Sequence, residues 1–196
     1  MSLKELLARK QVRQAHDRRL LRTIVQAALT GGPRALETAL ATPPQQDEQW
    51  RFLGRAMRAI GRRPAIHPSV RSGLIAFWVR NGDDLRGEMT RAELVRLLRV
   101  VFPPYEGPDL TLYRGENGGW ARRTPSLSWT RDIQIARAFA QESGRLHELG
   151  GVVLQAIVPA EQIIADLADH DHADEQEVLA DARGLASQAL EHYPST

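Results

Sequence analysis

The chain has 196 residues, of which 26 are Lys or Arg, 24 are Asp or Glu, 42% are apolar and none is cysteine. The ordinary apolar fraction excludes wholesale disorder, and a chain of this length can bury roughly 70% of its unfolded surface. Without cysteine there is no disulfide, no thiolate metal site and no cysteine nucleophile. No apolar run approaches the length of about 18 residues that spans a bilayer, and the N-terminus is too charged for a secretory signal. We therefore expect a cytoplasmic protein without a membrane partner.

Charge divides the chain into two parts of opposite sign. Residues 1–109 carry 19 basic and 11 acidic side chains, whereas residues 110–196 carry 7 basic and 13 acidic ones. This asymmetry predicts two structural parts with a boundary near 103–108, giving a helical N-terminal lobe over 1–105 and a second domain over 106–196. The basic part could attract phosphates or an acidic partner surface, or the two halves could simply attract each other.

Apolar residues recur at helical spacing through the first half. We expect Gly31-Gly32-Pro33 to end one helix and open the next, and Gly61 to end a third. Thr90 and Glu93 form a capping-box pattern before the last helix of this half. The predicted helical segments are 3–7, 20–29, a short helix from Pro33, 50–60, 68–80 and 94–101.

The hydrophobic period shortens in the second half, which predicts strands. Asp132 is the expected N-cap of a helix over 132–141, and Pro159 closes the clearest strand. The predicted strands are 110–114, 126–130, 151–158 and 175–180, and residues 166–174 are expected to form an acidic irregular segment.

Three short patterns follow one another in this half: YRGE at 113–116, SWT at 128–130 and EQEVL at 175–179. Together they resemble the Arg–Ser–Glu class of mono-ADP-ribosyltransferases, to which cholera-type and clostridial toxins and vertebrate arginine-specific enzymes belong. That family has an arginine on its first core strand, a Ser-Thr-Ser-like element on the second, and a later Glu-x-Glu. The resemblance covers roughly 110–182, little more than a third of the chain.

The match can be followed residue by residue. Arg114 stands at the family's arginine position, and Ser128 at its leading serine, while Thr130 replaces the usual final serine. The helix that follows carries the family's Ala-x-x-Phe at Ala136 and Phe139. The segment 175–179 fits the Glu-x-Glu-Val-Leu form of the family.

The resemblance implies a fold, a substrate and a set of roles. The fold would be α+β, with the helical lobe packed on a core of two small antiparallel β-sheets around an NAD cleft. NAD would be the substrate, Glu177 would bind the ribose 2′-hydroxyl, and Ser128 would bind the ribose or hold the catalytic glutamate in its rotamer. The residues assigned to catalysis are Glu177, Glu175, Arg114 and Ser128, and those assigned to NAD binding are Arg114, Gly115, Ser128, Thr130, Trp120 and Phe139.

The chemistry of NAD agrees with these assignments. Breaking the nicotinamide–ribose bond develops oxocarbenium charge on the sugar, so a carboxylate such as Glu177 stabilises the transition state more than the ground state. Alternate residues of a strand share a face, so we expect Glu175 beside Glu177, where it could orient an acceptor guanidinium and take its proton. The rigid guanidinium fork of Arg114 suits a pyrophosphate.

Each residue also has a purely structural interpretation. Arg114 could pair with Glu116 or with a C-terminal acid and only tie strands together. Ser128 and Asp132 could simply start the helix, and the two glutamates could be the solvent face of an edge strand. Trp120 could stack on a base or anchor a surface loop, and Gly115 could let the backbone approach a ligand or only make a turn.

The acidic segment 166–174 precedes the glutamate pair, where the family places acceptor recognition, and its charge suits a cationic acceptor. His170 and His172, with the neighbouring aspartates, match no strong metal motif, so no metal is expected. We therefore expect transfer of ADP-ribose from NAD to an acceptor, with a protein arginine favoured and a nucleic acid left open. The alternatives are an NAD glycohydrolase and an inactive module that binds NAD or nucleic acid. By resemblance the protein would be a bacterial or phage toxin or effector, and an accompanying antitoxin or chaperone stays open.

Overall fold

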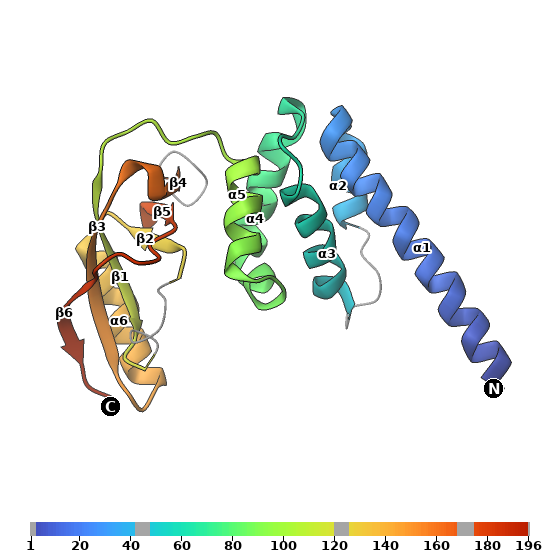
Figure 1. Cartoon of the computed structure of the whole chain (residues 1–196). Coiled ribbons are helices and arrows are strands. Elements are labelled where there is room, and N and C mark those ends of the chain that lie inside the picture. The colour runs from blue at the N-terminus through green and yellow to red at the C-terminus, as the bar shows by residue number, and fades with distance from the viewer. Residues whose placement is uncertain (1–2, 42–47, 120–125, 168–174, 196) are drawn as a thin grey trace. The chain divides into compact units, whose positions relative to one another are not determined.

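The computed structural model of the chain describes residues 3–41, 48–119, 126–167 and 175–195. The chain forms two compact units, Met1–Phe102 and Pro103–Thr196 (Figure 1). The first unit is helical, and every strand of the described residues belongs to the second, so the predicted α+β class is confirmed. Among the described helices, none combines the length and the apolar character that a membrane span requires.

The described part of the first unit consists of helices. They are α1 (Leu3–Thr30), α2 (Pro33–Ala41), α3 (Gln49–Gly61), α4 (Pro68–Glu88) and α5 (Arg91–Val101). The predicted break between the first two helices is confirmed: Gly31 takes the left-handed φ of 82°, and Pro33 opens α2 with its φ already fixed. By contrast, α4 runs to Glu88 instead of residue 80, because Leu85 is buried in the core and Gly82 lies against the ring of Trp78.

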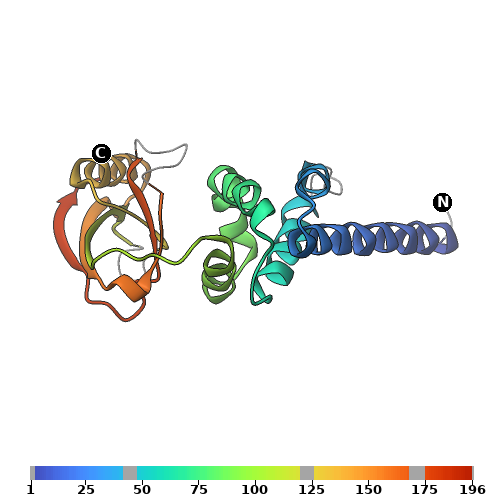
Figure 2. The same ribbon diagram turned by 90° about the horizontal axis from the view of Figure 1, so that it is seen from above.

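The two halves of α1 differ in their surroundings. Its second half packs against α2 and α3 and buries Ile24, Ala27 and Ala28. Residues 5–16 are exposed, and Figure 2 shows this first half extending beyond α2 and α3. The core of the unit therefore involves only the second half of α1, together with α2 to α5. Its largest buried side chains are Ile24, Leu36, Phe52, Leu53, Met57, Ile60, Leu74, Leu85 and Leu98.

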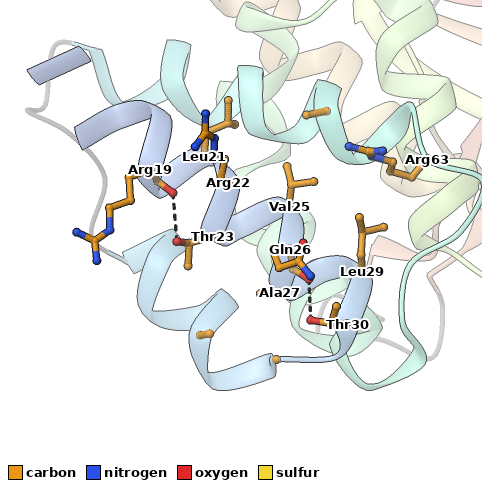
Figure 3. Close-up of a pocket in the computed structure, with 13 residues that line it drawn as sticks. Arg19, Leu21, Arg22, Thr23, Val25, Gln26, Ala27, Leu29, Thr30 and Arg63 are labelled. Carbon is orange, nitrogen blue, oxygen red and sulfur yellow. Dashed lines mark hydrogen bonds between the residues drawn. The ribbon is translucent and has the colours of Figure 1, made fainter. Parts of the chain in front are cut away.

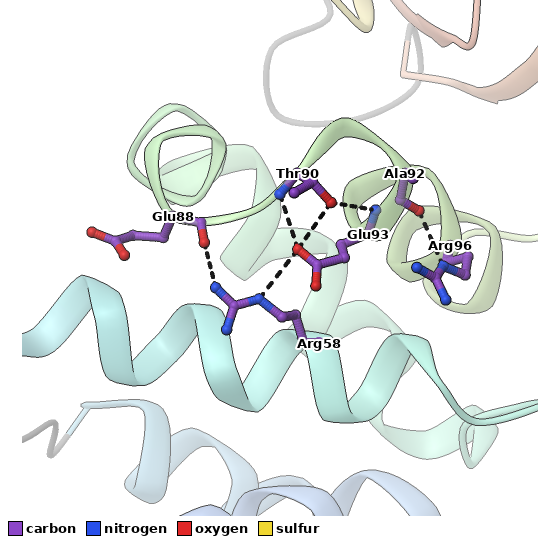
Figure 4. A network of polar contacts seen from close by, with 6 residues as sticks. All are labelled: Arg58, Glu88, Thr90, Ala92, Glu93 and Arg96. Atoms are coloured by element: carbon purple, nitrogen blue, oxygen red, sulfur yellow. Dashed lines mark hydrogen bonds and ion pairs between the residues drawn. The ribbon is translucent and has the colours of Figure 1, made fainter.

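A polar network fixes the corner between α4 and α5 (Figure 4). The predicted capping box is confirmed: the Thr90 hydroxyl accepts from the Glu93 backbone N–H, and the Glu93 carboxylate accepts from the Thr90 backbone N–H at 3.0 Å. Arg58 of α3 donates to the same carboxylate at 3.2 Å and to the carbonyl oxygen of Glu88 at 2.5 Å. The corner is thus attached to a third helix, and Glu93 is the residue shared by the cap and the attachment.

The second unit is built on one antiparallel sheet with the strand order β4-β5-β2-β1-β3-β6. The strands are β1 (Leu110–Asn117), β2 (Ser128–Thr130), β3 (Gly151–Val158), β4 (Ile163–Asp166), β5 (Glu177–Ala180) and β6 (Gln188–Tyr193). We expected two small sheets, but the described residues form one. The reason is β2, because its Thr130 pairs with Tyr113 of β1 on one side and with Glu177 of β5 on the other.

The two faces of this sheet are covered differently. Helix α6 (Ile133–Leu146) packs along β1 and β3 on one face, and Asp132 caps it as predicted, by accepting from the Gln134 backbone N–H at 2.7 Å. The opposite face carries the larger apolar cluster. Its buried members are Leu112, Trp129, Val152, Leu154, Ala156, Val158, Ile163, Val178, Ala180 and Ala182.

The ends of the predicted strands lie within three residues of the observed ones, whereas α4 extends eight residues and α6 five residues beyond the predicted end. The strand over 151–158 is confirmed at both ends, whereas β1 continues to Asn117 and β5 begins at Glu177 instead of residue 175. The strands β4 and β6 are additional. Residues 188–190 of β6 are all exposed, so this edge strand lacks the apolar alternation by which a half-buried strand is recognised.

Glu93 gives the α4–α5 corner a pH dependence. Its pKa is lowered, chiefly by the hydrogen bond from the Thr90 backbone and further by the Thr90 hydroxyl and Arg58, against an opposing effect of burial. A carboxyl whose pKa is lower in the folded chain stabilises the fold fully above its unfolded pKa, and this stabilisation is lost as the pH falls through the folded value.

We therefore expect Glu93→Gln to unfold at a lower urea concentration than the wild type at neutral pH. The gap between the two midpoints should shrink as the pH falls below about 4.5, the ordinary glutamate value. Glu37→Gln, at an exposed site on α2, is the control and should leave the midpoint unchanged. A gap that stays constant down to about pH 3 would contradict the assignment of the lowered pKa to Glu93.

Candidate active site

The three sequence patterns meet on neighbouring strands in the middle of the sheet. Arg114 lies on β1, Ser128 and Thr130 form the two ends of β2, and Glu177 is the first residue of β5. In the register of these strands Tyr113, Thr130 and Glu177 stand in one row across the sheet. The arginine, the serine and the second glutamate, which are far apart in sequence, are therefore brought within adjacent strands.

The row also shows which face each side chain occupies. Thr130 and Glu177 lie on the same face as their row partner Tyr113, which packs toward α6, and Ser128 shares this face because it is two residues from Thr130. Arg114 is offset by one residue and lies on the opposite face, where its pairing partner Leu154 belongs to the larger apolar cluster. The backbone alternation thus separates the arginine from the serine and the glutamate.

The guanidinium of Arg114 bonds to a residue of its own strand and to the neighbouring strand β2. Its Nε donates to the Glu116 carboxylate at 2.5 Å, and its Nη1 donates to the carbonyl oxygen of Ser128 at 2.5 Å. Both charged side chains are mostly buried, with 19% of Arg114 and 12% of Glu116 exposed. The pairing with Glu116 that the sequence offered as an alternative is therefore present within β1, and the bond to the Ser128 carbonyl ties β1 to β2. These two bonds use Nε and Nη1 and not Nη2.

Thr130 holds the segment before β5 in place. Its side chain is 6% exposed. Among the described residues it is the one polar side chain that is buried with the apolar core. The hydroxyl donates to the carbonyl oxygen of Glu175 at 2.9 Å and accepts from the backbone N–H of Asp132 at 3.1 Å. One hydroxyl therefore connects the end of β2, the N-cap of α6 and the first glutamate of the pair.

The two glutamates do not share one strand face, and the prediction that they do is wrong. The strand begins only at Glu177, and Gln176 takes a φ of 44°, in the left-handed region. This conformation turns the chain between the two carboxylates, so the alternation of a strand does not reach Glu175. Glu175 is exposed whereas Glu177 is half-buried, which gives the two carboxylates different access to solvent.

Arg131 is a residue near the site that sequence patterns did not indicate. Its backbone N–H donates to the carbonyl oxygen of Gln176 at 3.3 Å, and its guanidinium forms an ion pair with Asp166 at the end of β4. Asp166 and Gln176 stand at the two ends of the segment that connects β4 to β5. Arg131 thus holds both ends of that segment. In the sequence, the one sign of this role is its position directly after the Ser-x-Thr element.

Gly115 is required by the packing of α6. A Cβ atom added there would overlap the carbonyl oxygen of Ala136 and lie 2.6 Å from the backbone nitrogen of Ala140. The close backbone approach expected at this glycine is therefore made by a helix of the same chain. Phe139, also above Gly115, keeps 50% of its surface exposed and is the large aromatic side chain nearest to it.

A charged cluster fastens α6 to the edge of the sheet. Arg137 of α6 donates to both carboxylate oxygens of Glu191 on β6, at 2.9 and 3.1 Å from Nε, and the Tyr193 hydroxyl donates to the same carboxylate at 2.7 Å. The Arg137 guanidinium and the tyrosine hydroxyl lower the pKa of Glu191. These bonds hold α6, the helix that carries Phe139, to the edge strand β6, at the end of the sheet away from β5.

Some of the predicted site lies outside the described residues. Trp120, assigned to NAD binding, and the pair His170 and His172 are in this group. Within 3–41, 48–119, 126–167 and 175–195, no group of three or more His, Asp or Glu side chains could hold a metal ion. Of the other assigned residues, Ser128, Thr130, Glu177 and Gly115 share the α6 face, Arg114 lies on the opposite one, and Glu175 lies before the strand.

Comparison with protein-family models, with curated proteins and with solved structures gave no match for this chain. The site is therefore interpreted from its own residues and from the resemblance of its motifs.

We expect Thr130→Val to loosen the segment around Glu175, because valine keeps the shape of threonine but makes neither hydrogen bond. The lost bonds should lower the free energy of unfolding by about 1–3 kcal/mol. Hydrogen exchange should speed up at the amides of Arg131 and Asp132, both of which depend on this junction. Thr130→Ser keeps the hydroxyl and is the control; equal exchange in both variants would contradict the role of the hydroxyl.

Substitution at Gly115 tests the packing of α6. Gly115→Ala should lower the free energy of unfolding by about 1–3 kcal/mol or more, because the new methyl group meets backbone atoms of the helix. Gly73→Ala is the matched control: it lies inside α4 with no atom near its Cβ position, and should raise stability by about 0.5–1 kcal/mol. Urea unfolding of both variants measures the difference, and a neutral effect at Gly115 would refute the contact.

Proposed function

We propose that this protein is an NAD-dependent mono-ADP-ribosyltransferase that moves ADP-ribose from NAD to a macromolecular acceptor, with a protein arginine favoured, and releases nicotinamide. The observation that carries the proposal is the register of β1, β2 and β5. It brings the arginine, the serine and the second glutamate of three separate motifs onto the adjacent strands β1, β2 and β5, which follow the order of the motifs along the sequence.

The proposed binding of NAD involves residues on the face of the sheet that α6 covers. Ser128 and Glu177 are half-buried there on adjacent strands, and the half-exposed Phe139 lies on the helix above Gly115. A hydroxyl and a carboxylate are the groups that a ribose binds, and an exposed aromatic ring is a surface on which nicotinamide can stack. These residues fit the nicotinamide riboside part of NAD.

The reaction then follows from where charge develops. The bond between ribose C1′ and the nicotinamide nitrogen breaks, and its electron pair leaves with neutral nicotinamide. The positive charge that spreads over C1′ and the ring oxygen is stabilised by the carboxylate of Glu177, which interacts with it more strongly than with intact NAD. A guanidinium nitrogen of the acceptor forms the new bond to C1′ and gives up a proton.

Glu175 is the proposed acceptor of that proton. Its exposure suits a residue that must meet a second macromolecule, whereas the half-buried Glu177 suits one that faces a bound small molecule. The left-handed turn at Gln176 and the hydrogen bond from Thr130 to the Glu175 carbonyl fix the backbone between the two roles. The different exposure of the two glutamates therefore suits them to different roles, although they are only two residues apart in the sequence.

Arg114 acts as a positioning residue in this proposal. Its bond to the Ser128 carbonyl holds β2 against β1 and so places the serine, and its bond to Glu116 fixes the guanidinium for that contact. Because its side chain lies on the face opposite to Ser128 and Glu177, the proposal does not include the pyrophosphate contact that the sequence suggested. Arg114→Lys should weaken this positioning, since a lysine cannot make two bonds from one plane.

The proposal is tested with NAD labelled in its adenylate half, purified full-length protein, and a cell lysate as the source of acceptors. We expect label in the protein fraction, and we expect Glu177→Ala to abolish both transfer and NAD cleavage. Glu175→Gln should abolish transfer and retain much of the cleavage. Glu148→Gln, at an exposed position outside the site, is the matched control and should transfer as the wild type does.

Each other outcome selects an alternative. Label only in free ADP-ribose identifies an NAD glycohydrolase, and label in nucleic acid changes the acceptor. Equal loss of transfer and cleavage in Glu175→Gln overturns the division of roles between the glutamates. A folded protein that cleaves no NAD in any fraction is a binding module, and the proposal is then wrong.

A further inference from the structure

The helical unit contains a groove of about 770 Å³ over the second half of α1, between α2 and α3 (Figure 3). Leu21, Val25 and Leu29 recur every four residues on the side of α1 toward α3, and Ala59 of α3 lines the groove with them. All four side chains are half-buried. They form an apolar strip, about two helical turns long, that the described residues leave partly uncovered.

Arginines are placed around this strip. Arg19 and Arg22 come from α1 and Arg63 follows α3, and all three are exposed. No carboxylate lines the groove among the residues that the structure describes, and none of the three guanidinium groups has an ion-pair or hydrogen-bond partner among them. Other arginines of the same unit differ in this respect, because Arg55 pairs with Asp17 and Arg58 with Glu93. The groove therefore combines an apolar floor with cations that lack partners.

This combination favours one class of occupant. Single-stranded nucleic acid binds to surfaces where aromatic rings stack on its bases, and no described residue that lines the groove is aromatic. A small apolar ligand is usually enclosed on most of its surface, whereas this strip lies open. An amphipathic helix buries one apolar stripe in an open groove and keeps its other face in water, which matches both the length and the openness of the strip.

We propose that the groove binds an acidic amphipathic helix of a partner protein. Apolar side chains of that helix would cover Leu21, Val25 and Leu29, and carboxylates beside them would pair with Arg19, Arg22 and Arg63. This proposal is independent of the proposed enzymatic activity, because it involves only residues of the helical unit. It gives the basic first half of the chain a specific place of contact.

The experiment uses the full chain and a fluorescein-labelled model peptide of about 20 residues, long enough to form a helix when bound. The peptide has leucines along one helical face and glutamates on the other, and a second peptide has lysine in place of every glutamate. We expect saturable binding of the glutamate peptide, no binding of the lysine peptide, and amide shifts at Val25 and Ala59 in the complex.

Two double variants of α1 separate the groove from general electrostatics. R19E/R22E changes two arginines of the groove, and R9E/R13E makes the same charge change on the exposed first half of the helix. The first should weaken binding about tenfold or more and the second less than about twofold. All four positions are exposed, so both variants should keep the helical circular dichroism of the wild type.

The outcomes that overturn the proposal are equally definite. Equal weakening by both double variants would show a diffuse attraction of charge instead of a groove. Stronger binding of a uridine oligonucleotide than of the glutamate peptide would assign the surface to nucleic acid. Absence of saturable binding by the glutamate peptide, with the wild type folded, would refute the proposal directly.

Discussion

The hydroxyl of Thr130 joins three segments that have to be placed together for the site to exist. It donates to the Glu175 carbonyl, accepts from the Asp132 amide, and belongs to the residue that pairs with both β1 and β5. Its burial makes these bonds matter, because a buried hydroxyl without partners is costly and the alternatives in water are absent. The shortest strand of the sheet is therefore also the one that fixes the glutamate pair and the start of α6.

Strand β1 is constrained from both faces at consecutive residues. On one face Gly115 lets the backbone of α6 come into contact with the strand, and on the other Arg114 binds Glu116 and the Ser128 carbonyl. A small residue and a long charged one thus serve one purpose, the position of β1 relative to its neighbours. Arg114 and Gly115, which the sequence suggested as ligand contacts, therefore serve first to position β1.

The helices and the main strands could be predicted because their signals are local. Caps at Thr90 and Asp132, the break at Gly31 and the apolar run of β3 each depend on residues a few positions apart. For the candidate site, the sequence suggested which residues to consider but not how they are arranged. The left-handed Gln176 is not glycine, so nothing local showed that Glu175 leaves the strand. The contacts of Arg131 depend on strand pairing between distant residues, and the exposed β6 has no apolar alternation to detect.

Arg131 fastens Asp166 and Gln176, the two ends of the connection between β4 and β5, to the end of β2. Leu167, directly after Asp166, also donates its backbone N–H to the carbonyl oxygen of Glu177 at 2.8 Å. The contact of Arg131 with Asp166 is an ion pair between partly exposed side chains, whereas its contact with Gln176 is a backbone hydrogen bond. High salt, which screens charges near the surface, would therefore weaken the first of these contacts and leave the second in place.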